Sequence, residues 1–134
     1  MENPKQINYQ LSVTGQPSPE DLQQASEAGF KSVLNLRSAG EANSLPDEQE
    51  QAEAAGLNYA NVPLDSSTPD GDLLTKALWE IEALPKPILV HCGAGQRAGA
   101  VALIATAFKE EWTLEQLTET AIEIGLSLDQ PHLK

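Results

Sequence analysis

Segments with strand character alternate with segments with helix character along the whole chain. Short apolar or weakly alternating runs predict strands, and apolar residues at helical spacing predict helices. We expect strands over residues 8–13, 30–37, 57–64 and 88–92, and helices over 19–28, 46–55, 73–84, 97–108 and 113–125. Strands separated by helices pair in parallel through right-handed crossovers. The pattern therefore predicts a three-layer α/β fold in which helices flank a mostly parallel central sheet.

Residue types that start and stop helices fix some of these boundaries. Ser18 is placed as an N-cap with Pro19 at the first helical position, and Gly29 stops the helix that follows. Thr113 and Gln116 form a capping box before the last helix. For this helix we expect an inward-facing side formed by Leu114, Leu117, Ala121 and Ile124.

The stretch "PILVHCGAGQRAGAVALIATAF" stands out as an apolar strand, a short glycine-rich bend and a second apolar run. The strand is continuous and apolar, as expected of one buried on both faces of a sheet. The helix over 97–108 is apolar nearly all round, so we expect it in the middle of the domain. The chain's only cysteine, Cys92, ends the strand immediately before the bend.

Four chemically active side chains are expected to meet at one edge of this sheet. Arg37 ends the second predicted strand, Asp65 follows the third and Cys92 ends the fourth. Ligands of such sheets bind beyond the carboxyl ends of the strands. Arg97 begins the next helix and is expected to reach the same place, so both arginines of the chain would gather near its one thiol.

The bend after Cys92 has the features of an anion-binding loop. Small residues let backbone N–H groups turn toward one centre, and the N-terminus of the following helix adds partial positive charge. The guanidinium of Arg97 offers a planar fork to oxyanions. A thiol in that field should lose its proton readily and act as a nucleophile, whereas the alternative is a small buried hydrophobic side chain. The N–H groups expected to form the loop belong to Gly93, Ala94, Gly95 and Gln96.

His91 has two interpretations from the sequence. It could form a hydrogen bond near the base of the loop and help to fix it, or it could be a buried histidine whose partners are backbone groups. Arg37 is equally open, because it could extend the positive field over the site or only pair with Glu41.

The composition limits the partners of the protein. The 134 residues fit one domain, residues 1–134, and the formal net charge of −12 repels phosphate backbones and anionic lipid. We therefore expect neither nucleic acid nor a membrane surface as partner. No long apolar segment or targeting signal is present, and a lone thiol suits a reducing compartment, so we expect a soluble cytoplasmic protein. No metal or nucleotide motif is present, and we expect no cofactor.

The segment "HCGAGQRAG" resembles the active-site loop of the protein tyrosine phosphatase superfamily. The wider pattern, which includes "LSVTGQPSPEDL", "GFKSVLNLRS" and "ILVHCGAGQRAGA", is similar to the phosphatase-like domain of the bacterial β-lactamase hydrolase-like proteins. This resemblance implies a tyrosine or dual-specificity phosphatase-like fold. It also implies that Cys92 is the nucleophile, that Arg97 holds the anion and that residues 93–96 complete the loop.

Two features depart from the phosphatase pattern. Cys92 and Arg97 are separated by four residues where tyrosine phosphatases have five, and four is the spacing of rhodanese-type sulfurtransferases. Ala98 stands where phosphatases place the Ser or Thr hydroxyl that helps the cysteine thiolate to leave. A tighter loop with one donor fewer should stabilise phosphoryl transfer less well. These features favour sulfur transfer through a Cys92 persulfide, with thiosulfate or a persulfide as the small anionic substrate.

Two other functions stay open. One is a phosphatase acting on phosphotyrosine or small phosphoesters through a Cys92 phosphocysteine, and the other is an inactive anion-binding module. A phosphatase needs a general acid, for which Asp65 is best placed and Asp70 and Asp72 are rivals. All three aspartates could instead serve only as loop and helix-cap residues. The sequence indicates neither the natural substrate nor the oligomeric state.

Overall fold

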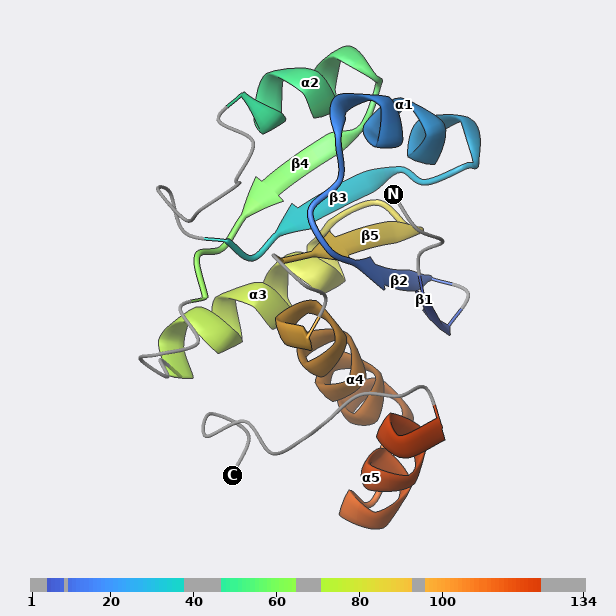
Figure 1. Ribbon diagram of the computed structural model, residues 1–134. Helices are drawn as coiled ribbons and strands as arrows, with labels where there is room; N and C mark the ends of the chain where they lie inside the picture. Colours follow the sequence, from blue (N-terminus) through green and yellow to red (C-terminus); the bar gives the residue numbers. More distant parts are fainter. Residues whose placement is uncertain (1–4, 9, 38–46, 65–70, 93–95, 124–134) are drawn as a thin grey trace.

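A computed structural model describes residues 5–8, 10–37, 47–64, 71–92 and 96–123 of the chain. Strands and helices alternate through most of these residues, as predicted (Figure 1). The strands are β1 (Lys5–Asn8), β2 (Leu11–Thr14), β3 (Ser32–Asn35), β4 (Asn58–Asn61) and β5 (Ile88–His91). The helices are α1 (Pro19–Glu27), α2 (Glu48–Ala54), α3 (Gly71–Ala83), α4 (Gln96–Glu110) and α5 (Leu114–Glu123).

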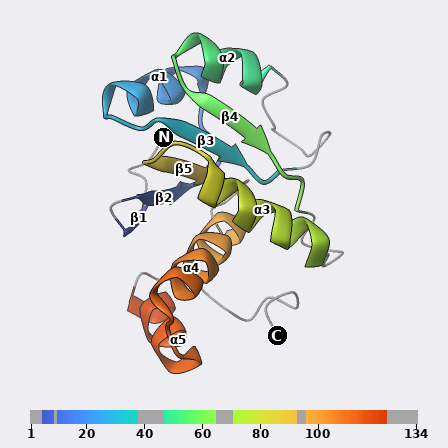
Figure 2. The same cartoon turned by 180° about the vertical axis from the view of Figure 1, so that it is seen from behind.

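The five strands form one mixed sheet with the order β1-β2-β5-β3-β4. β2, β5, β3 and β4 pair in parallel, and only the edge strand β1 runs antiparallel to its neighbour. α1 and α2 cover one face, while α3 and α4 cover the other (Figures 1 and 2). The structure thus confirms a three-layer α/β fold with a mostly parallel central sheet.

Each face of the sheet has its own hydrophobic cluster. Neighbouring strand residues point to opposite faces, so Val33 packs with Leu22 of α1 and Ala52 of α2, whereas Leu34 belongs to the cluster beneath α3 and α4. The central strand β5 is buried along its whole length, as expected from its continuous apolar sequence.

The helix boundaries follow the local signals closely. Ser18 caps α1, and its side chain and that of Asp21 form a reciprocal capping box. Gly29 and Gly56 follow α1 and α2 with φ angles of 104° and 86°, a conformation that favours glycine. The predicted capping box of α5 is also present, since Thr113 N–H donates to Gln116 Oε1 and Gln116 N–H donates to Thr113 Oγ1.

The structure corrects the prediction of one strand over residues 8–13. The chain instead forms the β1–β2 hairpin, with a turn between Asn8 and Leu11. Asn8 Oδ1 accepts hydrogen bonds from the N–H groups of Gln10 and Leu11 at 2.8 and 3.0 Å. When an Asn side chain accepts these backbone N–H groups, they are not available for the hydrogen bonds of a continuous strand, and the backbone forms a turn.

The structure also corrects two burial predictions for the C-terminal helices. Residues 98–103 of α4 are buried, but Phe108 in its last turn is 73% exposed. Leu114 was expected to face inward and is 78% exposed, because α5 lies at the far end of α4, away from the sheet (Figure 1). Leu117 is half-buried, while the Ala121 side chain and Ile124 lie outside the described part of the chain.

Candidate active site

The carboxyl ends of β3 and β5 lie side by side and bring Arg37 and Cys92 to the same edge of the sheet. Asn35, the last residue of β3, is in register with His91, the last residue of β5. The pairing continues one step further, since Leu36 N–H donates to the His91 carbonyl at 2.9 Å. Arg37 and Cys92 follow shortly after the ends of their strands, and both are buried.

Cys92 is held between the end of β2 and the start of α4. Its N–H donates to the Thr14 carbonyl at 3.4 Å, and its side chain is buried. The Ala98 N–H, in the first turn of α4, donates to Cys92 Sγ at 3.5 Å. A thiolate at this position would receive this hydrogen bond and the favourable field of the helix N-terminus. The position therefore suits a cysteine nucleophile.

His91 is fully buried behind Cys92 and touches a carboxylate. Its Nε2 lies 2.5 Å from Oε2 of Glu48, the first residue of α2, and its Nδ1 lies 3.4 Å from the Cys92 carbonyl oxygen. The sequence left open whether the partners of His91 were loop or backbone groups, and it did not suggest Glu48. A buried contact between His91 and Glu48 therefore links strand β5 to helix α2.

Glu48 and Arg37 are connected through one amide side chain. Gln16 Nε2 donates to Glu48 Oε1 at 2.7 Å and also to the Pro17 carbonyl, while Gln16 Oε1 accepts from Arg37 Nη1 at 2.9 Å. Glu48 is 2% exposed and Arg37 is 6% exposed. We call Arg37, Gln16, Glu48 and His91 the buried polar chain. Burial of these charges is tolerable because each has a hydrogen-bond partner.

Sequence reasoning missed both Gln16 and Glu48. Gln16 lies in the "GQP" segment that supported the family resemblance without a chemical role. Glu48 belongs to an acidic helix whose neighbours Glu50 and Glu53 are exposed, so its residue type did not distinguish it from a solvated surface.

Asn35 and Tyr59 form hydrogen bonds at the end of β3, next to Arg37. Asn35 Nδ2 donates to the Tyr59 hydroxyl at 2.9 Å, and Asn35 Oδ1 accepts from the Arg37 N–H at 2.8 Å. Burial, with a smaller contribution from the nearby Glu48 carboxylate, raises the pKa of Tyr59 to about 12 against the lowering effect of the Asn35 hydrogen bond.

Several predicted site residues lie outside the described residues. These are Gly93, Ala94, Gly95, Asp65 and Asp70. Gln96, Arg97 and Asp72 are placed only as backbone: Gln96 and Arg97 are the first two residues of α4, and Asp72 is in the first turn of α3. The roles predicted for these residues therefore stay predictions.

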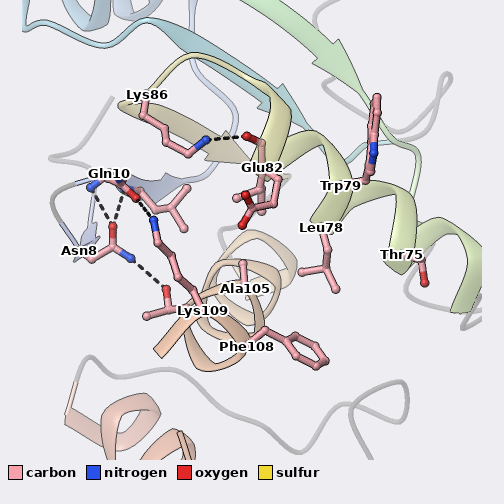
Figure 3. A pocket seen from close by; sticks show the side chains of 13 residues that line it. Asn8, Gln10, Thr75, Leu78, Trp79, Glu82, Lys86, Ala105, Phe108 and Lys109 are labelled. Carbon is pink, nitrogen blue, oxygen red and sulfur yellow. Dashed lines mark hydrogen bonds between the residues drawn. The ribbon is translucent and has the colours of Figure 1, made fainter. Parts of the chain in front are cut away.

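A separate cavity of about 540 Å³ lies at the opposite end of the sheet (Figure 3). It is lined by residues of the β1–β2 hairpin, α3 and α4, among them Leu11, which begins β2, and Lys86, which precedes β5. Its two lysines have partners within the protein, since Lys109 Nζ donates to Gln10 Oε1 and Lys86 Nζ donates to the Glu82 and Leu84 carbonyls. Cys92 follows the other end of β5, so this cavity does not contribute to the candidate active site.

The described residues provide no cluster of three or more His, Cys, Asp or Glu side chains that could bind a metal ion. No helix among them is both long and apolar enough to cross a membrane.

Residues 4–109 match the family model described as the phosphatase-like domain of β-lactamase hydrolase-like protein. A curated relative, the β-lactamase hydrolase-like protein of Agrobacterium fabrum (strain C58), is 33% identical over 95 residues, which are 69% of this chain and 22% of the relative. The chain thus spans about a fifth of the length of that curated relative.

Solved structures of phosphatases share the fold. A candidate phosphatase (DUF442) from Shewanella putrefaciens CN-32 has a TM-score of 0.79 and 25% identity, over 88% of this chain and 76% of that chain. Tk-PTP in its active form has a TM-score of 0.82 and 21% identity, over 98% and 91%. TpbA of P. aeruginosa, in complex with pTyr, has a TM-score of 0.71 and 16% identity, over 88% and 70%. The tyrosine phosphatase-like fold implied by the sequence resemblance is confirmed.

Proposed function

The chain belongs to the family of phosphatase-like domains of β-lactamase hydrolase-like proteins, and on this basis we propose that it is a cysteine-dependent phosphatase for small aryl phosphates such as phosphotyrosine. The observation that carries the proposal is the buried Cys92 thiol at the β5–α4 junction, with the Ala98 N–H directed at its sulfur. The solved TpbA structure contains pTyr, which supports an aromatic phosphate as the substrate class.

In the proposed reaction the Cys92 thiolate attacks the phosphorus atom of the substrate. The bond from phosphorus to the leaving oxygen breaks, and that oxygen takes a proton from a general acid, for which Asp65 is our first choice and Asp70 and Asp72 are the alternatives. Water then attacks the phosphocysteine, the S–P bond breaks and inorganic phosphate leaves. Arg97 and the N–H groups of residues 93–96 would stabilise the charge on the phosphoryl oxygens.

Sulfur transfer, which the loop spacing favoured, becomes the second candidate. The comparisons do not support it, since the family model and the structures described above carry phosphatase names. Two observations in the sequence still favour it: the four residues between Cys92 and Arg97, and the absence of a hydroxyl at Ala98. In this reaction the Cys92 thiolate attacks the outer sulfur of thiosulfate, the S–S bond of thiosulfate breaks, sulfite leaves and Cys92 becomes a persulfide.

Two assays on the same preparation test the proposal. We expect turnover of a chromogenic aryl phosphate that is abolished by Cys92→Ser, and no persulfide by mass spectrometry after thiosulfate treatment. A persulfide on Cys92 without phosphate release would instead establish the second candidate. Binding of inorganic phosphate with neither activity would leave the anion-binding module as the function.

The departures from the phosphatase pattern give a second prediction for the proposed enzyme. Replacing Ala98 by Ser should raise aryl phosphate turnover, because the hydroxyl can assist departure of the Cys92 thiolate. Insertion of one residue between Gly93 and Gln96 should raise it further, since each well-placed donor can contribute about 3 kcal/mol, or roughly a hundredfold in rate. Steady-state kinetics of Ala98→Ser, of the insertion variant and of their combination measure the change in aryl phosphate turnover. Unchanged or lower turnover in all three would show that loop length does not limit the reaction.

A further inference from the structure

Glu48 holds the one contact that joins His91 to the rest of the buried polar chain. Its side chain is 2% exposed, and both carboxylate oxygens are occupied, Oε2 by His91 Nε2 and Oε1 by Gln16 Nε2. The reaction proposed above gives Glu48 no part, because its carboxylate is buried and contacts only His91 and Gln16 among the contacts described above. A buried carboxylate with such complete pairing nevertheless requires a reason.

The contacts of His91 define where its protons lie. The Cys92 carbonyl oxygen can only accept a hydrogen bond, so its 3.4 Å contact with His91 Nδ1 is favourable when Nδ1 carries a proton. The 2.5 Å contact between His91 Nε2 and Glu48 Oε2 requires a second proton between these two atoms. The pair together then holds two protons and is neutral in sum, which lowers the cost of burying it.

From these contacts we propose that Glu48 is a positioning residue for Cys92: it fixes the ring and protonation of His91, and His91 in turn fixes the Cys92 carbonyl at the start of the anion-binding loop. The proposal deepens the proposed function and rests on it for its kinetic part. The Cys92 carbonyl belongs to the peptide that leads into residues 93–95, so its direction affects where the loop N–H groups point. Substitution of a residue that orients a functional histidine through a hydrogen bond commonly changes activity by about tenfold to a hundredfold.

Glu48→Gln is the variant that removes the carboxylate charge and the proton shared between position 48 and His91 Nε2. If the new amide directs its oxygen at His91 Nε2, its NH₂ group faces Gln16 Nε2, and two donors meet. If Gln16 then turns over, its NH₂ group faces Arg37 Nη1, and the conflict moves to that contact. The contacts are all satisfied only when the new NH₂ group donates to His91 Nε2 and the new amide oxygen accepts from Gln16 Nε2, which leaves His91 as a neutral ring with its single proton on Nδ1. A neutral ring is a weaker donor to the Cys92 carbonyl than a charged one. We therefore expect kcat for aryl phosphate to fall about tenfold to a hundredfold, with KM changed less than kcat.

A second substitution should repair part of the defect. In Gln16→Glu/Glu48→Gln, the new carboxylate at position 16 accepts from Arg37 and from the new amide at position 48, and the oxygen of that amide accepts from His91 Nε2. The Pro17 carbonyl loses its donor, so recovery should be partial. The matched control is Glu50→Gln, which removes the same charge from an exposed position of the same helix and should keep wild-type kinetics.

The spectroscopic test does not depend on activity. The chain has two histidines, His91 and His132, so ¹⁵N-histidine labelling with His132→Gln as reference isolates the His91 ring. In the wild type we expect a strongly deshielded proton on Nε2 and, for both ring nitrogens, ¹⁵N chemical shifts typical of protonated nitrogens. Glu48→Gln should remove the proton on Nε2 and keep the proton on Nδ1, and the double variant should restore the proton on Nε2.

The outcomes separate the two proposals. If the wild type is active and Glu48→Gln keeps both the His91 signature and wild-type kcat, the positioning role is wrong. It is also wrong if the wild-type His91 ring shows an unprotonated Nδ1. If the wild type shows no turnover but the His91 signature is present and depends on Glu48, the proposed function fails while the structural part of the inference stands. If Glu48→Gln does not fold, a double variant that folds and regains activity supports the inference, and one that folds without regaining activity contradicts it.

Discussion

At the scale of single residues, Arg37 makes a contact that its sequence context did not suggest. The sequence indicated either a positive field over the site or a surface pair with Glu41. Arg37 is buried and donates to Gln16, and because Glu41 lies outside the described residues both interpretations stay predictions. Its guanidinium thus stabilises the amide that holds Glu48. A charged side chain within the protein can act on the active site through the groups it orients.

Tyr59 provides a pH-dependent test at this scale. Its pKa is raised from 10.0 to about 12 because burial disfavours the phenolate and the Glu48 charge repels it. The folded state therefore favours neutral Tyr59, and this contribution to stability is fully present below pH 10 and is lost as the pH rises toward 12. We expect the difference in tyrosinate absorbance between the wild type and Tyr59→Phe to show a midpoint near pH 12. A midpoint near 10.0 would mean that Tyr59 is solvated.

At the scale of elements, the β1–β2 hairpin depends on one side chain with two tasks. Asn8 Oδ1 accepts the two N–H groups of the turn, and Asn8 Nδ2 donates to Thr106 Oγ1 of α4 at 2.9 Å. The Thr106 hydroxyl in turn donates to the Ala102 carbonyl. The hairpin turn is thereby connected to the helix that begins at the candidate active site.

Asn8→Ala should lower the free energy of unfolding by about 1–2 kcal/mol, since the turn N–H groups and the Thr106 hydroxyl each lose a partner. Urea denaturation measures the change. Thr106→Val is the matched control, because it removes the hydroxyl that accepts from Asn8 Nδ2 and keeps the oxygen of Asn8 that the turn N–H groups need. Equal losses in the two variants would show that the turn contacts contribute nothing to stability.

At the scale of the whole molecule, the net charge of −12 destabilises the folded state relative to the unfolded state. Like charges on a compact surface repel one another, and salt screens this repulsion over about 8 Å at physiological ionic strength. The acidic helix α2 contributes exposed Glu50 and Glu53 to it, with no basic residue in its last turn.

We therefore expect the Tm to rise when sodium chloride is increased from a very low concentration to about 0.15 M. Differential scanning calorimetry at constant pH checks the shift. Removing two charges in Glu50→Gln/Glu53→Gln should make the Tm less sensitive to salt. A Tm that falls with salt would mean that attractive ion pairs outweigh the repulsion.

The sequence by itself determined the segments of the five helices and of β3, β4 and β5 and the position of the predicted anion-binding loop, whereas it did not predict the β1–β2 hairpin. Apolar periodicity, N-caps and helix-ending glycines are local signals, and the apolar strand before Cys92 and the glycine-rich bend after it are contiguous. The family resemblance rested on the same contiguous residues. These features needed no knowledge of distant contacts.

Only the tertiary structure decided how the polar side chains pair behind the site. Glu48 and His91 are 43 positions apart, and Gln16 and Glu48 are 32 apart, so no local pattern joins them. Periodicity indicates which face of an element is apolar, but it does not indicate which polar groups meet once two faces of a sheet are covered. The exposure of Leu114 was decided in the same way, because the apolar side of a helix is buried only where another element lies against it.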